Sequence, residues 1–392
     1  MRVAHLADAH LGFRQFQRLD PRGVNQREAD VAAAFGRTIE AIIARQPDAV
    51  IIAGDLFHAV RPTNRSIIEA FSQLARLRRV MPHVPVALIA GNHDTPRSAE
   101  AGSILGLMRS LGVDVVDDMS QRLHYPELNL SLLAVPHADL LRGTKTWLPD
   151  GRAKYNVLVM HPEIAGYFPE YGESDYGGVR VEAADLGTQW NYVALGHYHI
   201  CTEVAPRAWY SGSLEYTSSN IWLESKLEKE RRVTKGFQVV ELEKGIVERV
   251  PLPPERIVHD LPSLDASGMS ARDLDAAIQG RIAGVAGGIA DTVTRLVVWN
   301  APRELAHELD HAAIRALRAQ ALHFHLDLRR PEPTGRTVGV GGPGSRLPLP
   351  ELVESYLSRR PLDAELDRTR LVALGREFLE KVDIEYAGEH RA

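Results

Sequence analysis

Polar residues of the kinds that bind metals follow five short apolar runs of this chain, and this pattern constrains the fold more than any other feature. The runs are aliphatic or β-branched, which is typical of buried strands. The motifs that follow them are Asp8-Ala9-His10, Gly54-Asp55-Leu56-Phe57-His58, Gly91-Asn92-His93-Asp94, Met160-His161-Pro162 and Gly196-His197-Tyr198-His199. Because open α/β sheets place their sites at the carboxyl ends of successive strands, we expect the motifs to converge.

Seven side chains in these motifs are candidate metal ligands. They are Asp8, His10, Asp55, Asn92, His161, His197 and His199. Oxygen and imidazole ligands without a thiolate suit manganese, iron or zinc rather than a closed structural zinc site. Seven ligands are too many for one ion that keeps an open position. The pattern therefore predicts two metal ions that share a bridging carboxylate, as in two-metal phosphoester hydrolysis.

The composition is that of an ordinary globular protein, with 392 residues of which 44% are hydrophobic and 25% charged. A formal net charge of -5 excludes a global basic field, so any contact with nucleic acid must come from local patches or from the metals. The single cysteine, Cys201, excludes an internal disulfide. Without a signal peptide or an apolar run of membrane-spanning length, we expect a soluble, cytoplasmic protein.

Strands and helices alternate in the first part of the chain. Strands are predicted at 2–7, 49–53 and 85–90, separated by amphipathic helices at 30–44 and 64–79. This alternation predicts an α/β fold. Further strands are predicted at 129–135, 156–160, 192–195, 208–211 and 236–241, with fewer helices between them. We therefore expect a second, more antiparallel sheet that packs on the first.

The composition changes at residues 251–254, Pro-Leu-Pro-Pro, which predicts a domain boundary. A smaller β/α unit follows, in which Ser270 and Asp273 have the spacing of a helix capping box. The predicted division is 1–250, 251–330, a glycine- and proline-rich linker at 331–349, and two amphipathic helices within 350–392. Because so short a helix pair cannot bury its apolar faces well, we expect it to dock on a partner helix or coiled coil. The alternative is that it packs back on the chain.

The five motifs, in their order, resemble those of the calcineurin-like metallophosphoesterase superfamily. Together with Tyr210-Ser211-Gly212-Ser213-Leu214-Glu215, they resemble more narrowly the nuclease subunit of the SbcC/SbcD-type double-strand-break-repair complex. The resemblance is strong over about residues 1–245. It implies a metallophosphoesterase β-sandwich flanked by helices in four layers, with 251–330 as a capping domain that recognises DNA. It also implies a homodimer, and an ABC-type coiled-coil ATPase partner that the C-terminal helices bind.

The resemblance also assigns roles to single residues. One metal would be held by Asp8, His10 and His199, the other by Asn92, His161 and His197, with Asp55 bridging. His93 would be catalytic, either protonating the leaving 3′ oxygen or neutralising charge on the phosphate, and His58 would support it. The metals would be two divalent ions, most often Mn²⁺. The expected activity is a DNA exonuclease or endonuclease.

The residues after Asp55 discriminate within the superfamily. Its protein phosphatases carry Asp-Arg-Gly shortly after the bridging aspartate, whereas this chain has His58-Ala59-Val60-Arg61. A diesterase that acts on DNA is therefore favoured over a phosphomonoesterase. Two alternatives stay open: a phosphodiesterase for nucleotides or other small molecules on the same scaffold, and a largely structural clamp for DNA ends.

Other polar residues have two interpretations each. The loop at 14–18 either touches DNA phosphates, with Phe16 stacking on a base, or is an ordinary solvated loop. His323, His325 and Asp327 share one face of a strand, where a solvated surface is favoured over a metal site. Most other histidines, such as His137, are predicted to be core or surface residues.

Overall fold

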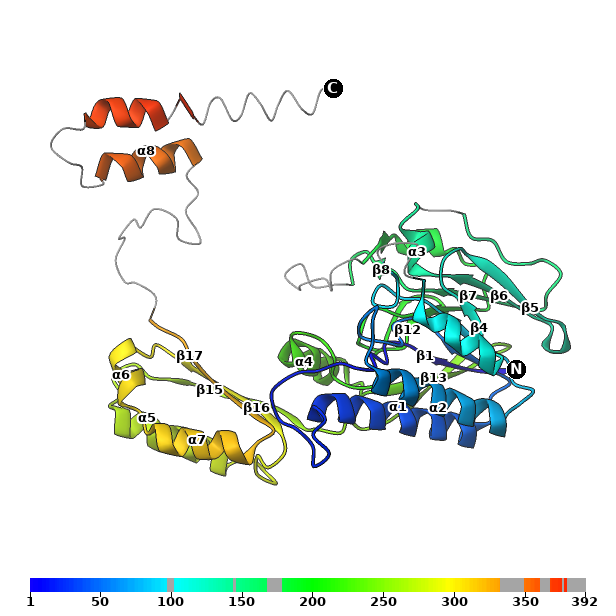
Figure 1. The fold of residues 1–392 in the computed structure, drawn as a ribbon, viewed down its shortest axis with the longest axis horizontal. Helices are drawn as coiled ribbons and strands as arrows, with labels where there is room; N and C mark the ends of the chain where they lie inside the picture. Colours follow the sequence, from blue (N-terminus) through cyan, green and yellow to red (C-terminus); the bar gives the residue numbers. More distant parts are fainter. Residues whose placement is uncertain are drawn as a thin grey trace.

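The computed structural model describes residues 1–96, 102–143, 146–167, 178–331, 349–359, 367–375 and 377–378. Two six-stranded sheets form the centre of the larger unit (Figure 1). The first has the order β14-β13-β1-β2-β3-β4, with bounds Ile246–Pro251, Gly236–Glu241, Arg2–Leu6, Ala49–Ile52, Val86–Ile89 and Asp114–Val116. The second has the order β11-β12-β10-β7-β6-β5, with bounds Thr202–Ala205, Ala208–Tyr210, Tyr192–Leu195, Tyr155–Met160, Leu130–Val135 and Gln121–Tyr125. A further pair, β8 (Glu163–Ile164) and β9 (Arg180–Val181), follows β7.

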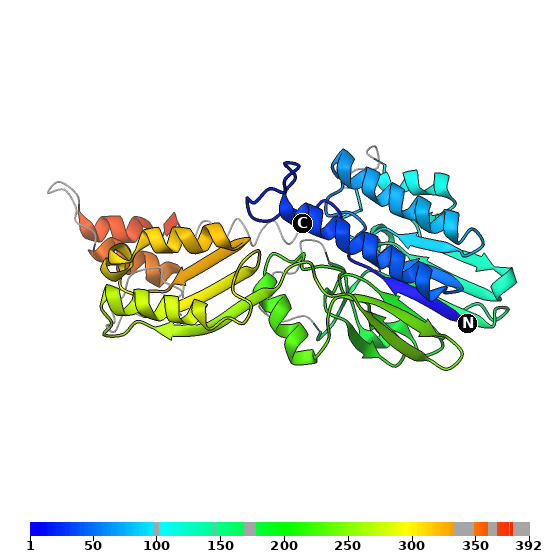
Figure 2. The same cartoon turned by 90° about the horizontal axis from the view of Figure 1, so that it is seen from below.

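Helices cover the outer faces of this sandwich. Helices α1 (Gln26–Arg45) and α2 (Asn64–Val80) lie along the first sheet, where Phe35, Ile39 and Leu74 enter its core. In Figure 2, α1 and α2, drawn in blue, lie together on one side of the strands of the larger unit. Helix η2 (Ile104–Leu111) also packs on the first sheet, beside α2 and β4. The other short helices of the larger unit are η3 (Pro126–Leu128), α3 (His137–Leu140), η4 (Ala183–Leu186) and α4 (Ile221–Arg231). The predicted α/β sandwich flanked by helices is confirmed.

The prediction of a more antiparallel second sheet is wrong at its centre. Strands β6, β7, β10 and β12 run parallel, and only the edge strands β5 and β11 are antiparallel. Parallel neighbours need long crossovers, and the only helices in the described parts of these crossovers are the short α3 and η4, which give little sequence signal. The strand predicted at 236–241 is present as β13, but it pairs with β1 in the first sheet.

A smaller unit follows β14 and contains three parallel strands, β15 (Val258–Asp265), β16 (Val293–Trp299) and β17 (His323–Leu328). Helices α5 (Ala271–Ala283), α6 (Arg303–Glu308) and α7 (His311–Gln320) pack on one face of this sheet and share one apolar core with it. Helix α5 begins with the predicted capping box, because Ser270 and Asp273 bond to each other's backbone N–H.

The C-terminal part is described only in pieces. The predicted linker at 331–349 lies outside the described residues except for its two ends. Beyond it, α8 (Leu349–Arg359) and residues 368–375 are helical. Within the described ranges, we find no helix whose length and apolar character would let it cross a membrane.

Candidate metal centre

The predicted ligands come from loops that follow parallel strands of both sheets. In the first sheet, β1 precedes Asp8 and His10, β2 precedes Asp55, and β3 precedes Asn92. In the second sheet, β7 precedes His161, and its parallel neighbour β10 precedes the last histidine motif. The two sheets are joined at this edge, because the His197 N–H donates to the Asp8 carboxylate (2.9 Å). The expected convergence of the five motifs is present.

Backbone contacts hold the loops in register. The His10 N–H donates to the Asp55 carbonyl (3.0 Å), so the first two motifs run side by side. The Asp94 carboxylate connects the third motif to the second, since it accepts hydrogen bonds from the N–H groups of Leu56, Phe57 and Gly91 at 3.0–3.2 Å. Buried Asp94 therefore holds the second and third motifs together.

Four site residues have left-handed backbone conformations, which are uncommon outside glycine. The φ angles are 54° at Asp8, 48° at His10, 52° at Asp55 and 99° at His197. Such strained conformations persist only where the surrounding contacts determine them, and they concentrate at functional sites. These backbone conformations direct several candidate ligands toward one point.

One group of possible ligand atoms contains Asp8, His10 and His199, all buried. The Nε2 atoms of the two histidines lie 3.0 Å apart and face each other. Burial, followed by the neighbouring histidines, holds the pKa of His10 well below its usual value, although the Asp55 carboxylate opposes this shift. His10 is therefore neutral, which is the state that binds metals.

A second group contains Asp55, His161 and His197. The Nδ1–H of His161 donates to the Ala53 carbonyl (2.7 Å), so its Nε2 faces Asn92 Oδ1 at 3.1 Å and Asp55 Oδ2 at 3.2 Å. His197 Nδ1 also lies 3.0 Å from Asn92 Oδ1. Nitrogen and oxygen acceptors thus crowd into one small volume.

Asp55 lies between the two groups, as a bridging ligand would. Its Oδ2 is 3.7 Å from His10 Nε2 in the first group and 3.2 Å from His161 Nε2 in the second. Its other oxygen accepts the His93 N–H (2.9 Å). The side chain of Asp55 therefore lies near residues of both groups.

The electrostatics of the centre favour divalent cations. Burial raises the pKa of Asp8 to about 7, and the Asp55 charge adds to this, although His161 opposes it. Burial alone would lower the pKa of His161, but the Asp55 and Asp8 carboxylates and the hydrogen bond to Ala53 together raise it to about 9. In the protein alone, a proton on His161 therefore offsets part of the negative charge. Two divalent ions would offset it fully, so these residues fit such ions.

Two predicted catalytic histidines lie beside the first group. The His93 Nδ1–H donates to the His58 carbonyl (2.8 Å), and the two rings stack with centroids 5.1 Å apart. The His93 Nε2 is buried and has no hydrogen-bond partner, while its ring contacts that of His10 (4.8 Å). His58 also packs edge-on against Phe13. His93 therefore presents one uncommitted nitrogen within the centre.

Two glycines are required by close approach of the loops. A Cβ on Gly91 would lie 2.1 Å from Asp55 Oδ1, and one on Gly196 would lie 2.0 Å from the Ala53 carbonyl. Real Cβ contacts are essentially never this short. Glycine at these two positions is therefore needed for the ligands to meet.

Sequence reasoning missed three buried or half-buried residues beside the centre. Glu163 Oε1 accepts from His197 Nε2 (3.2 Å), and Glu224 Oε1 lies 3.7 Å from His199 Nδ1. His137 follows β6, and burial, followed by the positive charge of His161, lowers its pKa to about 4. Glu163 stands two residues after His161, and this spacing was the available signal. Glu224 is distant in sequence and gave none.

The loop at 14–18 makes contacts that its sequence did not indicate. Arg14 pairs with Glu28 (2.7 Å), Phe16 stacks on His323 with ring centroids 3.9 Å apart, and Arg18 donates to the Ala319 carbonyl (2.8 Å). The loop therefore joins the metal centre to the smaller unit. Among the described residues, the strand face of His323, His325 and Asp327 forms no metal-ligand group.

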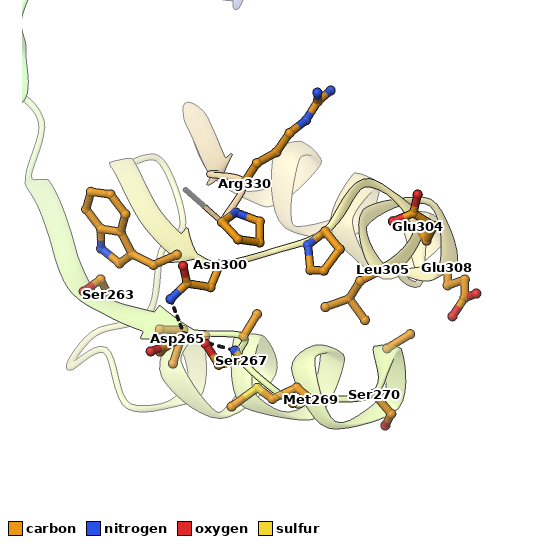
Figure 3. A pocket seen from close by; sticks show the side chains of 17 residues that line it. Ser263, Asp265, Ser267, Met269, Ser270, Asn300, Glu304, Leu305, Glu308 and Arg330 are labelled. Carbon is orange, nitrogen blue, oxygen red and sulfur yellow. Dashed lines mark hydrogen bonds between the residues drawn. The ribbon is translucent and has the colours of Figure 1, made fainter. Parts of the chain in front are cut away.

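A separate hollow lies in the smaller unit, at the carboxyl ends of β15 and β16 (Figure 3). Asp265 accepts hydrogen bonds there from Asn300 (3.0 Å) and Ser267 (2.7 Å), and Met269 and Leu305 contribute apolar walls. None of the predicted site residues lines it.

Comparison with protein families identifies the class to which this metal centre belongs. The model described as "Calcineurin-like phosphoesterase" matches residues 1–201, which is more than half of the chain. The chain therefore belongs to the calcineurin-like phosphoesterase family, whose members use divalent metals. The likeness to the superfamily inferred from the motifs is confirmed.

Relatives within this family carry one recurring name, "DNA double-strand break repair protein Mre11". The protein of that name from Methanococcus maripaludis is 28% identical over 207 residues, covering 51% of this chain and 52% of the relative. The one from Methanocaldococcus jannaschii is 28% identical over 253 residues, covering 62% of each. The one from Archaeoglobus fulgidus is 38% identical over 218 residues, covering 51% and 46%. The chain thus spans between about half and three fifths of these relatives.

One solved structure is also similar, the nuclease MPE of Pseudomonas putida. It is 23% identical, with a TM-score of 0.21, and the match covers 41% of this chain and 61% of that one. So low a score adds nothing to the assignment.

Proposed function

We propose that this chain is a manganese-dependent DNA nuclease that hydrolyses phosphodiesters at DNA ends during double-strand break repair. The observation that carries the proposal is the pair of ligand groups that share Asp55, with the unpaired Nε2 of His93 beside them. The similarity to proteins named for double-strand break repair supports DNA as the substrate.

The metals would occupy the two groups already described. Asp8, His10 and His199 would hold one ion, and Asn92, His161 and His197 the other, with Asp55 between them. Two divalent ions would supply Lewis-acid neutralisation of the phosphodiester charge and lower the pKa of a water. Imidazole and carboxylate ligands suit Mn²⁺, and the Nδ1–H of His161 is already committed to Ala53, which leaves its Nε2 for metal.

His93 would act on the substrate. Its Nδ1–H bond to the His58 carbonyl fixes the ring, so that a proton held on Nε2 points into the centre. In the doubly protonated state, Nε2 can donate that proton to the leaving 3′ oxygen, or place positive charge beside the phosphate. His58 supports this geometry through its carbonyl and its stacked ring.

We further propose that the smaller unit, 251–330, recognises DNA, and that the chain forms a homodimer. In this proposal the helices within 350–392 bind an ABC-type coiled-coil ATPase, joined to the cap by the linker 331–349. Leu374 in the second helical stretch supports the last part, because it is exposed and offers apolar surface to a partner helix.

The test is cleavage of linear duplex DNA by the purified chain with Mn²⁺ or with a chelator. We expect Mn²⁺-dependent release of nucleotides. His93→Ala should keep both metal ions but lower the rate by about 10²- to 10⁴-fold, as loss of a general acid does. His197→Ala should lose metal and cleavage together.

Full activity in both variants would overturn the proposal. Mn²⁺-dependent turnover of nucleotide esters, without cleavage of DNA, would favour the small-molecule phosphodiesterase instead.

A further inference from the structure

A buried cluster of charges lies behind the metal centre and has no part in the mechanism above. It consists of Glu224 and Glu228 on α4 and Lys235 just before β13, and all three side chains are at most 6% exposed. Lys235 pairs with both carboxylates. Two buried carboxylates share one ammonium, so one negative charge lacks a partner within the cluster. Such a charge is costly unless another positive charge lies nearby.

His199 connects this cluster with the candidate metal ligands. Its Nε2 faces His10 Nε2 (3.0 Å) within the first ligand group, and its Nδ1 faces Glu224 Oε1 on the opposite side (3.7 Å). Histidines that bind metals through one nitrogen commonly direct the other to a carboxylate, which fixes the tautomer and raises the basicity of the ligand. The two nitrogens of His199 face a candidate ligand and a carboxylate in this order, with the carboxylate at ion-pair distance.

The Glu224 carboxylate is held from several sides. Oε1 accepts from Ser213 Oγ (3.1 Å) and from Lys235, while Oε2 accepts from both the N–H and the hydroxyl of Ser218 (3.2 and 2.7 Å). Lys235 also donates to the His199 carbonyl (3.4 Å). The carboxylate therefore cannot turn away from the imidazole without breaking several bonds.

We propose that Glu224 is the positioning residue of His199. It keeps the imidazole proton on Nδ1, leaves the Nε2 lone pair for the cation, and supplies the negative charge that balances the ion held by Asp8, His10 and His199. The inference rests on the proposed function, since it assigns a purpose to one ligand of that centre.

Helix α4 gives this contact a wider consequence. Its first residue, Ile221, packs with Val258 and Val293 of the smaller unit, and the Trp222 ring lies under the Arg295 guanidinium (4.9 Å). Helix α4 therefore carries both the Glu224 carboxylate that faces His199 and residues that contact the smaller unit.

The test is titration of the full chain with Mn²⁺, following the free ion by electron paramagnetic resonance. We expect two ions to bind the wild type. In Glu224→Gln, one ion should bind about 10- to 100-fold more weakly, which is the usual effect of removing a group that orients a metal ligand. The other ion should keep its affinity.

Glu228→Gln is the matched control. Glu228 is equally buried on the same helix and shares Lys235, and its other oxygen accepts a hydrogen bond from the Tyr216 hydroxyl (2.7 Å). We expect its Mn²⁺ affinities to equal those of the wild type. We expect both substitutions to lower the free energy of unfolding by similar amounts, as measured by urea unfolding in chelator. This comparison separates the loss of a buried charge from the loss of ligand positioning.

Equal Mn²⁺ affinity in Glu224→Gln and wild type would overturn the inference, and so would equal weakening in both variants. These failures are distinct from failure of the proposed function, which would show as a wild type that binds Mn²⁺ but does not cleave DNA.

Discussion

Single buried histidines in this chain have opposite protonation states, although their sequence contexts look alike. His5 on β1 and His161 after β7 are both fully buried. Burial lowers the pKa of His5 to about 3, because its hydrogen bond with Gln238 only partly opposes desolvation. The pKa of His161 moves in the other direction, since Asp55 and Asp8 surround it. The neighbours, and not the residue type, decide the charge.

His5 makes stability depend on pH. It is neutral in the folded chain and titrates near 6.5 when unfolded, so its contribution is complete above pH 6.5 and is lost as the pH falls toward 3. We compare the unfolding free energy of the wild type with that of His5→Gln. Below pH 6, the wild-type value should fall relative to that of the variant by about 1.4 kcal/mol per pH unit. Urea unfolding in chelator at several pH values measures this. His83→Gln, at an exposed histidine, is the control, and parallel curves for wild type and His5→Gln would contradict the prediction.

At the scale of elements, the loops after strands matter more than the strands themselves. The first three motifs are joined by the His10–Asp55 backbone bond and by the Asp94 carboxylate. Glycines allow this close approach, and Gly91 is the position where a side chain would clash with the Asp55 carboxylate. The ligand geometry is therefore sensitive to a single methyl group.

Gly91→Ala should displace the Asp55 carboxylate, because the new Cβ would lie 2.1 Å from Oδ1. We expect Mn²⁺ affinity to fall roughly tenfold or more while the circular dichroism spectrum stays unchanged, as small misplacements of site groups have large effects. Equilibrium dialysis with metal analysis measures the affinity. Gly280→Ala on α5 is the control, since its Cβ meets nothing within 4 Å, and helix propensity should stabilise it by up to about 1 kcal/mol. Unchanged Mn²⁺ binding in Gly91→Ala would contradict the expectation.

At the scale of the whole molecule, contacts of several kinds attach the smaller unit. Phe16 stacks on His323. Arg256 forms a bidentate pair with Asp30 (2.9 Å). The apolar cluster around Val258 and Val293 adds burial. The chain segment that follows the first metal motif is part of this attachment, so the position of the smaller unit is coupled to the metal centre.

Replacing Phe16 and Arg18 together by alanine should loosen the attachment without removing a ligand. We expect faster hydrogen exchange in residues 13–25 and 319–325, with Mn²⁺ stoichiometry unchanged, since the stacking and the Arg18 bond to the Ala319 carbonyl are lost. Exchange mass spectrometry measures this. Leu19→Ala, at a 59% exposed residue of the same loop, should leave exchange as in the wild type. Identical exchange in all three proteins would show that the loop does not hold the smaller unit.

Much of the site could be predicted from the sequence, because its residues stand at strand ends within glycine-containing motifs. Asp8, Asp55 and His197 each follow a recognisable strand, and sheet geometry predicts that such positions meet. The helices also carried clear signals, such as the cap at Ser270. The direction of the second sheet could not be predicted, because irregular crossovers leave no pattern that separates parallel from antiparallel strands.

The types of the candidate ligands, their order along the chain and the α/β class could be read from the sequence alone, because they depend on local patterns of apolar and polar residues. The charges that surround each candidate ligand became known from the fold. Glu224 lies 25 residues after His199 along the chain, yet its carboxylate faces that imidazole. Phe16 and His323 are separated by most of the chain, yet their rings stack. Such pairings arise from packing between distant elements, and no local pattern records them.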